Sequence, residues 1–152
     1  MKVKSNYVIF RVGDNDFGIE IQYVISIEKV TEITCLPQMP DYIKGITNLR
    51  GQMKGVIDAA TLLFNQSIEI DESTRFLLLD IHQSDIALMV SKTNEILSID
   101  EEEIKPIDSI NATSEIFKGV ALIDNRMISI LNIEKLLSTL DALETVSAVH
   151  LG

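Results

Sequence analysis

The segment Ile43-Lys44-Gly45-Ile46 recurs 74 residues later as Phe117-Lys118-Gly119-Val120, and this repetition decides the fold. The same shift superimposes two further pairs of segments: Arg50-Gly51 on Asp124-Asn125, and Val56-Ile57-Asp58 on Ile130-Leu131-Asn132. Each copy has an apolar strand, a short turn, a second apolar strand and a residue type that begins helices. The repeat predicts two similar small β-barrels, against the alternative of a chance likeness between two β-meanders.

Short strands and turns also fill most of the remaining chain. Tyr7-Val8-Ile9-Phe10 and Phe17-Gly18-Ile19 are rich in aromatic and β-branched residues, and they predict a hairpin. Residues 75–81 and 86–90 predict another, with both faces buried, because both strands are almost continuously apolar. After Asn132, apolar residues at helical spacing predict a C-terminal helix: Ile133, Leu136, Leu137, Leu140 and Leu143.

The length of 152 residues suits a single domain with its own core. The expected fold class is all-β, with two barrel subdomains, short helices and a C-terminal helix. We expect the first barrel over residues 14–66, the second over residues 1–13 plus 67–140, and a tail over residues 141–152.

Charge and composition narrow the class of partner. The chain has 13 Lys and Arg against 23 Asp and Glu, a net charge of −10, and it contains no Trp. A nucleic-acid binder needs a basic face, and anionic lipid attracts basic segments, so neither is an expected partner. No apolar run is long enough to cross a bilayer, and no signal peptide is evident, so we expect a cytoplasmic protein.

Residues suited to catalysis or metal binding are few and scattered. His82 falls in a predicted turn and His150 in the tail, without an acid placed to orient either. The single Cys35 excludes an internal disulfide, cannot bind zinc alone, and is expected to be buried in an apolar stretch. We therefore expect no enzyme activity, no cofactor and no metal. A ligand-binding or catalytic β-barrel remains an alternative, and it would need a pocket with converging polar groups.

Three residues have a local role that the sequence leaves open. Arg50 lies at a predicted hairpin tip, where it either forms a local salt bridge or contacts a partner, since Arg is enriched at interface hot spots. Ile107 and Ile110 stand in a polar loop, either as core residues or as exposed contacts.

The stretch Lys44-Gly45-Ile46-Thr47-Asn48-Leu49-Arg50-Gly51 resembles the signature of the CheW family of chemotaxis coupling proteins. The resemblance extends in order from about residue 7 to residue 140, and it is supported by further segments: residues 7–10, 17–19, 37–40, 56–58, 126–127 and 130–137. It implies two intertwined five-stranded SH3-like β-barrels around a shared hydrophobic core, in agreement with the repeat.

The resemblance also implies a function and a set of partners. The expected function is a non-catalytic adaptor that couples the cytoplasmic tips of chemoreceptors to the regulatory domain of the histidine kinase CheA, within receptor arrays at the inner face of the membrane. Other copies of the adaptor in array rings are a further implied partner. The alternative is a CheW-like coupling protein of another motility or two-component kinase system.

The resemblance assigns residues to two surfaces. A groove that binds a receptor helix would include Val24, Ile27, Arg50, Ala87 and Ile96. A kinase-binding surface would include Lys105, Ile107 and Ile110.

The chain departs from the family pattern in the first barrel. Lys54-Gly55 replaces an apolar residue and a proline, Ala59-Ala60 replaces Leu-Arg, and Ser26 replaces a Glu. These changes would alter the preference for kinase or receptor while keeping the fold.

Overall fold

The computed structural model describes residues 3–81, 85–106 and 116–138, and two antiparallel-rich sheets dominate them. The six-stranded sheet has the order β8-β1-β2-β11-β10-β9, with these bounds: β1 Lys4–Val12, β2 Asn15–Glu20, β8 Lys92–Asp100, β9 Ile104–Lys105, β10 Phe117–Ile123 and β11 Arg126–Leu131. The five-stranded sheet has the order β3-β6-β7-β5-β4, with these bounds: β3 Val24–Lys29, β4 Ile43–Leu49, β5 Gln52–Asp58, β6 Arg75–Leu79 and β7 Ile86–Val90.

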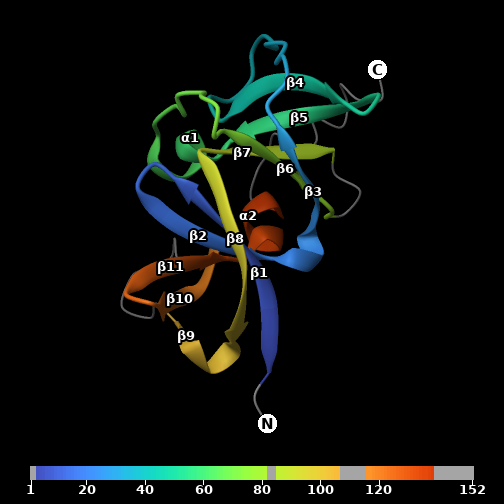
Figure 1. Cartoon of the computed structure of the whole chain (residues 1–152). Coiled ribbons are helices and arrows are strands. Elements are labelled where there is room, and N and C mark those ends of the chain that lie inside the picture. The colour runs from blue at the N-terminus through green and yellow to red at the C-terminus, as the bar shows by residue number, and fades with distance from the viewer. Residues whose placement is uncertain (1–2, 82–84, 107–115, 139–152) are drawn as a thin grey trace.

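In the described residues, three short helical segments connect strands and a fourth follows the last strand. They are the 3-10 turns η1 Ile21–Tyr23 and η2 Glu101–Glu103, and the helices α1 Ala59–Phe64 and α2 Ile133–Ser138. Figure 1 shows the five-stranded sheet above the six-stranded sheet, with α2 between them. The predicted all-β fold is confirmed, although one sheet has six strands instead of five because the two-residue β9 pairs with β10.

The predicted repeat is present as two matching hairpins, β4–β5 and β10–β11. Each first strand has a β-bulge at a glycine with positive φ, +145° at Gly45 and +156° at Gly119. A Cβ on Gly45 would lie 2.0 Å from the Thr34 carbonyl oxygen, and one on Gly119 would lie 2.4 Å from the Lys105 carbonyl oxygen. Only glycine fits, because in both barrels another strand segment crosses against the bulge.

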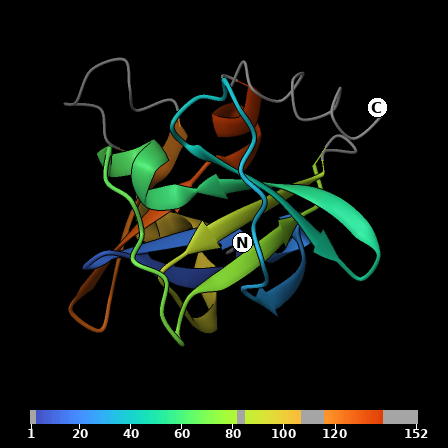
Figure 2. The same ribbon diagram turned by 90° about the horizontal axis from the view of Figure 1, so that it is seen from above.

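The two hairpins are also followed by matching hydrogen bonds and helix caps, and their tips point in opposite directions. The backbone N–H of Asp58 donates to the Tyr42 carbonyl, and that of Asn132 donates to the Ile116 carbonyl. The Asp58 and Asn132 side chains then cap α1 and α2 by accepting bonds from backbone N–H groups, as predicted. In Figures 1 and 2 the hairpin tips project from opposite sides of the molecule.

Buried apolar side chains of the described residues form three clusters. One, the shared core, draws on both sheets and both helices, for example through Val8, Leu77, Ala59 and Leu136. The second lies on the other face of the six-stranded sheet, and the third on the other face of the five-stranded sheet. Each sheet therefore curls around a small core of its own while the pair shares the largest core.

Sheet membership departs from the predicted subdomain limits. β2 pairs with β1 and β11, so it belongs to the six-stranded sheet, although residues 14–66 were expected to form the first barrel. β6 and β7 pair with β3 and β5, so the five-stranded sheet extends to Val90. The parallel pairing of β5 with β7 is a long-range contact, which strand patterns do not encode. Leu140, Leu143 and the predicted tail lie outside the described residues.

One further expectation is wrong. Cys35 is exposed instead of buried, because it lies in a mostly exposed segment whose backbone pairs with β4 through its neighbour Thr34, opposite Ile46.

Candidate functional site

The edge strands β3 and β8 carry exposed isoleucines. Each of the two is an edge strand of its own sheet, and both lie on the side that faces the viewer in Figure 1. Ile27 on β3 is 41% exposed and Ile96 on β8 is 55% exposed. Ile27 lies opposite Leu77 and Ile96 lies opposite Val8, and both of these partners belong to the shared core. The two isoleucines therefore extend the apolar faces of the shared core to the surface at two sheet edges.

The other predicted groove residues divide between surface and interior. Val24 is half-buried, lies opposite Leu79 and packs against the shared core. Ala87 is fully buried in β7, so it contributes no contact surface and we leave it out of the site. Ile25, which the sequence analysis did not single out, is 58% exposed beside Ile27 in the chain. Burial alternates along β3, but Val24-Ile25-Ser26-Ile27 has apolar residues at both half-buried and exposed positions, so hydrophobicity alone could not separate these residues.

Arg50 forms the local salt bridge that was one of its two interpretations. Its Nη2 atom lies 2.9 Å from Oε2 of Glu28, which connects the β4–β5 turn to β3. The Arg50 side chain is nevertheless 74% exposed, so it can also contact a partner. The turn itself is fixed by positive φ at Arg50 and Gly51 and by a 2.9 Å bond from Gly51 N–H to Asn48 Oδ1.

Backbone and hydroxyl contacts hold the chain after β3 against β4. Thr34 and Ile46 exchange two backbone hydrogen bonds of 2.8 Å. The hydroxyls of Thr31 and Thr47 lie 2.7 Å apart, and Thr47 also donates to the Glu32 carbonyl. These contacts close the five-stranded sheet into a barrel, and they fix the position of β3.

The turn that leads into β3 is anchored to the other subdomain. The Tyr23 hydroxyl donates a 2.9 Å hydrogen bond to Glu134 of α2, and Lys118 of β10 pairs with Glu20 at the end of β2. Burial raises the pKa of the Tyr23 hydroxyl, and the bond to Glu134 raises it further. The Tyr23–Glu134 bond ties the turn before β3 to α2, and the Lys118–Glu20 pair ties the end of β2 to β10 within the six-stranded sheet. Together they couple the placement of β3 to the six-stranded sheet and α2.

The Lys54-Gly55 departure has a structural partner. Lys54 is 7% exposed, and its Nζ donates a 2.9 Å bond to Oδ1 of Asp85. The Gly55 N–H donates a 2.7 Å bond to the Asp85 carbonyl, which a proline could not do. The departure is therefore accommodated within the fold, where it joins β5 to the start of β7.

The kinase-binding prediction falls only partly on described residues. Lys105 is exposed on β9 and lies opposite Val120 of β10. Ile107 and Ile110 lie outside the described residues. Within the described ranges, no three His, Cys, Asp or Glu side chains gather in a way that could hold a metal ion, and no helix there is long and apolar enough to cross a membrane.

Comparisons with known proteins agree with the fold and the repeat. The model of the CheW-like domain family matches residues 6–141. Chemotaxis protein CheW of Klebsiella aerogenes is 32% identical over 90% of this chain and 84% of its own length, and Protein FrzA of Myxococcus xanthus is 29% identical over 90% and 87%. The crystal structure of the scaffolding protein TtCheW from Thermoanaerobacter tengcongensis superimposes with a TM-score of 0.79 at 27% identity, covering 88% of each chain. This chain belongs to the CheW family.

Proposed function

We propose that this protein is a non-catalytic chemotaxis adaptor that couples chemoreceptors to the histidine kinase CheA at receptor arrays on the inner face of the membrane. Membership of the CheW family supports the adaptor function. The observation that carries the receptor contact is the exposure of Ile27 and Ile96 on two edge strands that flank the shared core. Exposed apolar side chains at such edges can pack against the apolar face of an amphipathic helix.

The proposed receptor surface consists of Ile25, Ile27, Ile96 and Arg50, together with the half-buried Val24. The isoleucines supply apolar contact area, and Arg50 supplies a guanidinium that is positioned by Glu28. An exposed ion pair contributes little to stability, so Arg50 is free to serve an interface. The surface offers contact area and hydrogen-bond donors, which are what an adaptor needs.

The kinase would bind the surface that includes Lys105, Ile107 and Ile110. Support for it comes from the family resemblance and from the exposure of Lys105 on β9. Lys105 lies on β9 and Ile96 on β8, at opposite edges of the six-stranded sheet, so receptor and kinase would contact different edges of the molecule.

Substitutions at the receptor surface test the assignment. We expect Ile27→Asp to weaken binding to a soluble receptor-tip fragment by about tenfold or more, and Arg50→Ala by less, because buried apolar anchors dominate interface energies. Binding is measured by titration calorimetry with receptor and kinase from the same organism. Thermal unfolding of both variants should match the parent, since both side chains are exposed.

The matched control is Ile70→Asp, an exposed isoleucine on the loop between α1 and β6. It should leave receptor affinity unchanged. Unchanged affinity in Ile27→Asp and Arg50→Ala together would exclude the proposed surface. Identification of the kinase that co-purifies from the native cell separates CheA from the kinase of another motility system.

A further inference from the structure

Leu122 and Met127 form an exposed apolar pair on the β10–β11 hairpin. They are 65% and 69% exposed, the most among the large apolar side chains of the described residues. They lie directly opposite each other in the strand register, and Val120 follows on the same face. A cross-strand apolar pair this open to water gives the fold little burial energy.

This pair sits on the same sheet face as the shared core. Ser129 of β11 lies beside Phe17 of β2 in the register, and Phe17 is a buried member of the shared core. Near β2 the face is covered by Phe64 of α1, whose ring lies 6.0 Å from that of Phe17. α1 ends at Phe64, and the outer part of the face beyond it carries the exposed Leu122 and Met127.

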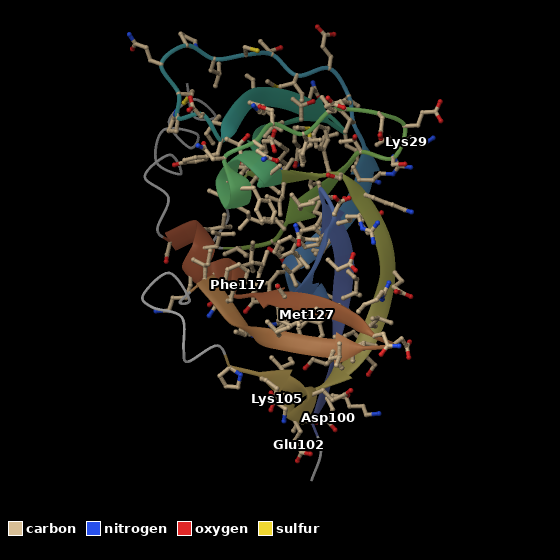
Figure 3. The ribbon with its side chains drawn as sticks, turned by 90° about the vertical axis from the view of Figure 1, so that its left-hand side faces the viewer. Lys29, Asp100, Glu102, Lys105, Phe117 and Met127 are labelled. Atoms are coloured by element: carbon tan, nitrogen blue, oxygen red, sulfur yellow. The ribbon has the colours of Figure 1, made fainter. Side chains whose placement is uncertain are left out.

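Two surface hollows lie along this uncovered face, and Met127 lines both. One of about 220 Å³ is lined by apolar side chains that include Phe64, Phe117 and Leu63, and by three polar residues, Asn15, Asp16 and Ser129. One of about 570 Å³ is lined by Val120, Leu122 and Met127, with three charged residues at its end: Glu102, Glu103 and Lys105. Figure 3 shows Phe117, Met127, Lys105 and Glu102 following one another down this side of the molecule. We call Phe64, Val120, Leu122 and Met127 the hairpin strip.

The charged residues at the lower end of the hairpin strip are mostly acidic. η2 consists of three consecutive glutamates, of which only Glu103 takes part in the capping box with Asp100. The guanidinium of Arg126, near the hairpin tip, is bound to Glu95. Lys105 is thus the single cation among the residues that line the larger hollow. An apolar surface with an acidic end complements an apolar segment that carries positive charge.

We propose that the hairpin strip is a docking surface for a protein segment with apolar side chains flanked by Lys or Arg. The segment would seat one apolar side chain in each hollow, on either side of Met127, and place its cations against η2. A second copy of this chain fits poorly, because each copy carries a charge of −10 and a symmetric contact would bring two sets of η2 glutamates together. The proposal goes beyond receptor and kinase binding, because none of the residues of the hairpin strip belongs to either of those surfaces. Only Lys105, at the end of the larger hollow, is shared with the kinase surface.

A peptide selection tests the proposal without assuming a partner. A random peptide display library is selected on the intact protein and counter-selected on Met127→Asp. We expect the enriched peptides to contain apolar residues flanked by Lys or Arg. Enrichment of acidic or uncharged peptides, or no enrichment over the variant, would overturn the proposal.

The selected peptide is then titrated by fluorescence anisotropy. We expect Leu122→Asp and Met127→Asp to weaken its binding by about tenfold or more, and Glu102→Gln to weaken it by a few-fold and to reduce its salt dependence. Ile27→Asp and Ile70→Asp are the matched controls, and they should leave peptide binding unchanged. Because Ile27→Asp reports on the receptor surface, failure of the receptor assignment and failure of this one are distinguishable.

Two further outcomes would contradict the proposal. Equal binding of the peptide to the parent and to both strip variants would place its site elsewhere. Self-association of the parent in sedimentation, lost in Met127→Asp, would make a second copy the occupant. Thermal unfolding of the strip variants should match the parent because both side chains are exposed.

Discussion

The hairpins β4–β5 and β10–β11 share a backbone plan and differ in their surfaces. Both have a bulge at a glycine, a turn with positive φ, a backbone bond back to an upstream carbonyl and a capped helix. At the tips, Arg50 pairs with Glu28 in one, whereas Asp124 and Asn125 form the turn in the other. The exposed pair Leu122–Met127 corresponds to Asn48–Met53. The shared positions determine the fold, and the divergent ones give the two hairpins different surfaces.

The largest expected effect is at the shared glycines. Gly45→Ala and Gly119→Ala should each lower the free energy of unfolding by on the order of 2–4 kcal/mol, because the new Cβ would clash with a backbone carbonyl that cannot move aside alone. Urea unfolding of both variants measures this loss in the free energy of unfolding.

Gly51→Ala is the matched control. It has positive φ but nothing within 4 Å of its Cβ position, so the loss should be about 1 kcal/mol, from backbone strain alone. Equal losses at Gly45 and Gly51 would show that conformation, and not the close approach, requires glycine at the bulge.

Removing the helix cap should destabilise the first hairpin unit more than the second. The Asp58 carboxylate is fully buried, accepts bonds from the N–H groups of Ala60, Thr61 and Ile68, and lies 3.7 Å from Lys44 Nζ. The Asn132 side chain accepts one 3.2 Å bond, from Lys135 N–H. We expect Asp58→Ala to cost about 3 kcal/mol and Asn132→Ala about 1 kcal/mol.

Chemical denaturation of the two cap variants measures this difference, and Asp58→Asn is its control. The amide keeps one acceptor oxygen, so it should recover part of the loss. Equal costs for the two alanine variants would mean that burial of Asp58 adds nothing to its capping role.

The smallest effect concerns Lys54, which corresponds to the buried Ile128 of the second hairpin. Lys54→Met should change stability by less than about 1 kcal/mol, because the apolar side chain of similar length no longer buries a charge and the Asp85 side chain, 25% exposed, is hydrated by water instead. Asp85→Ala should cost about 2 kcal/mol in the parent and clearly less in the Lys54→Met background.

A double-mutant cycle measured by urea unfolding gives the coupling between Lys54 and Asp85. A coupling energy near zero would mean that the 2.9 Å contact between Lys54 and Asp85 adds no net stability, so it would not compensate for the apolar packing that Ile128 provides in the second hairpin. The reverse change, Ile128→Lys, should be far more destabilising, because it would bury a charge at a fully buried apolar position.

Much of the fold could be predicted because its signals are local. The hairpins, the caps at Asp58 and Asn132, and the turn at Arg50-Gly51 follow from short patterns of apolar, turn and capping residues. The site was harder to predict. Ala87 is apolar like Ile27, but β7 is an inner strand and β3 an edge strand, so only one of them reaches the surface. Exposure depends on sheet position, which local pattern does not carry.

The sequence by itself determined the repeat, the turn at Arg50-Gly51, the capped helices and membership of the CheW family, because each depends on residue identity at short spacing. Only the tertiary structure decided which strands share a sheet, that Arg50 reaches Glu28, and that Leu122 and Met127 stand open to water. The physical reason is distance along the chain. Pairings such as β5 with β7 and β2 with β11 join segments far apart in sequence, and the packing of the whole molecule selects them.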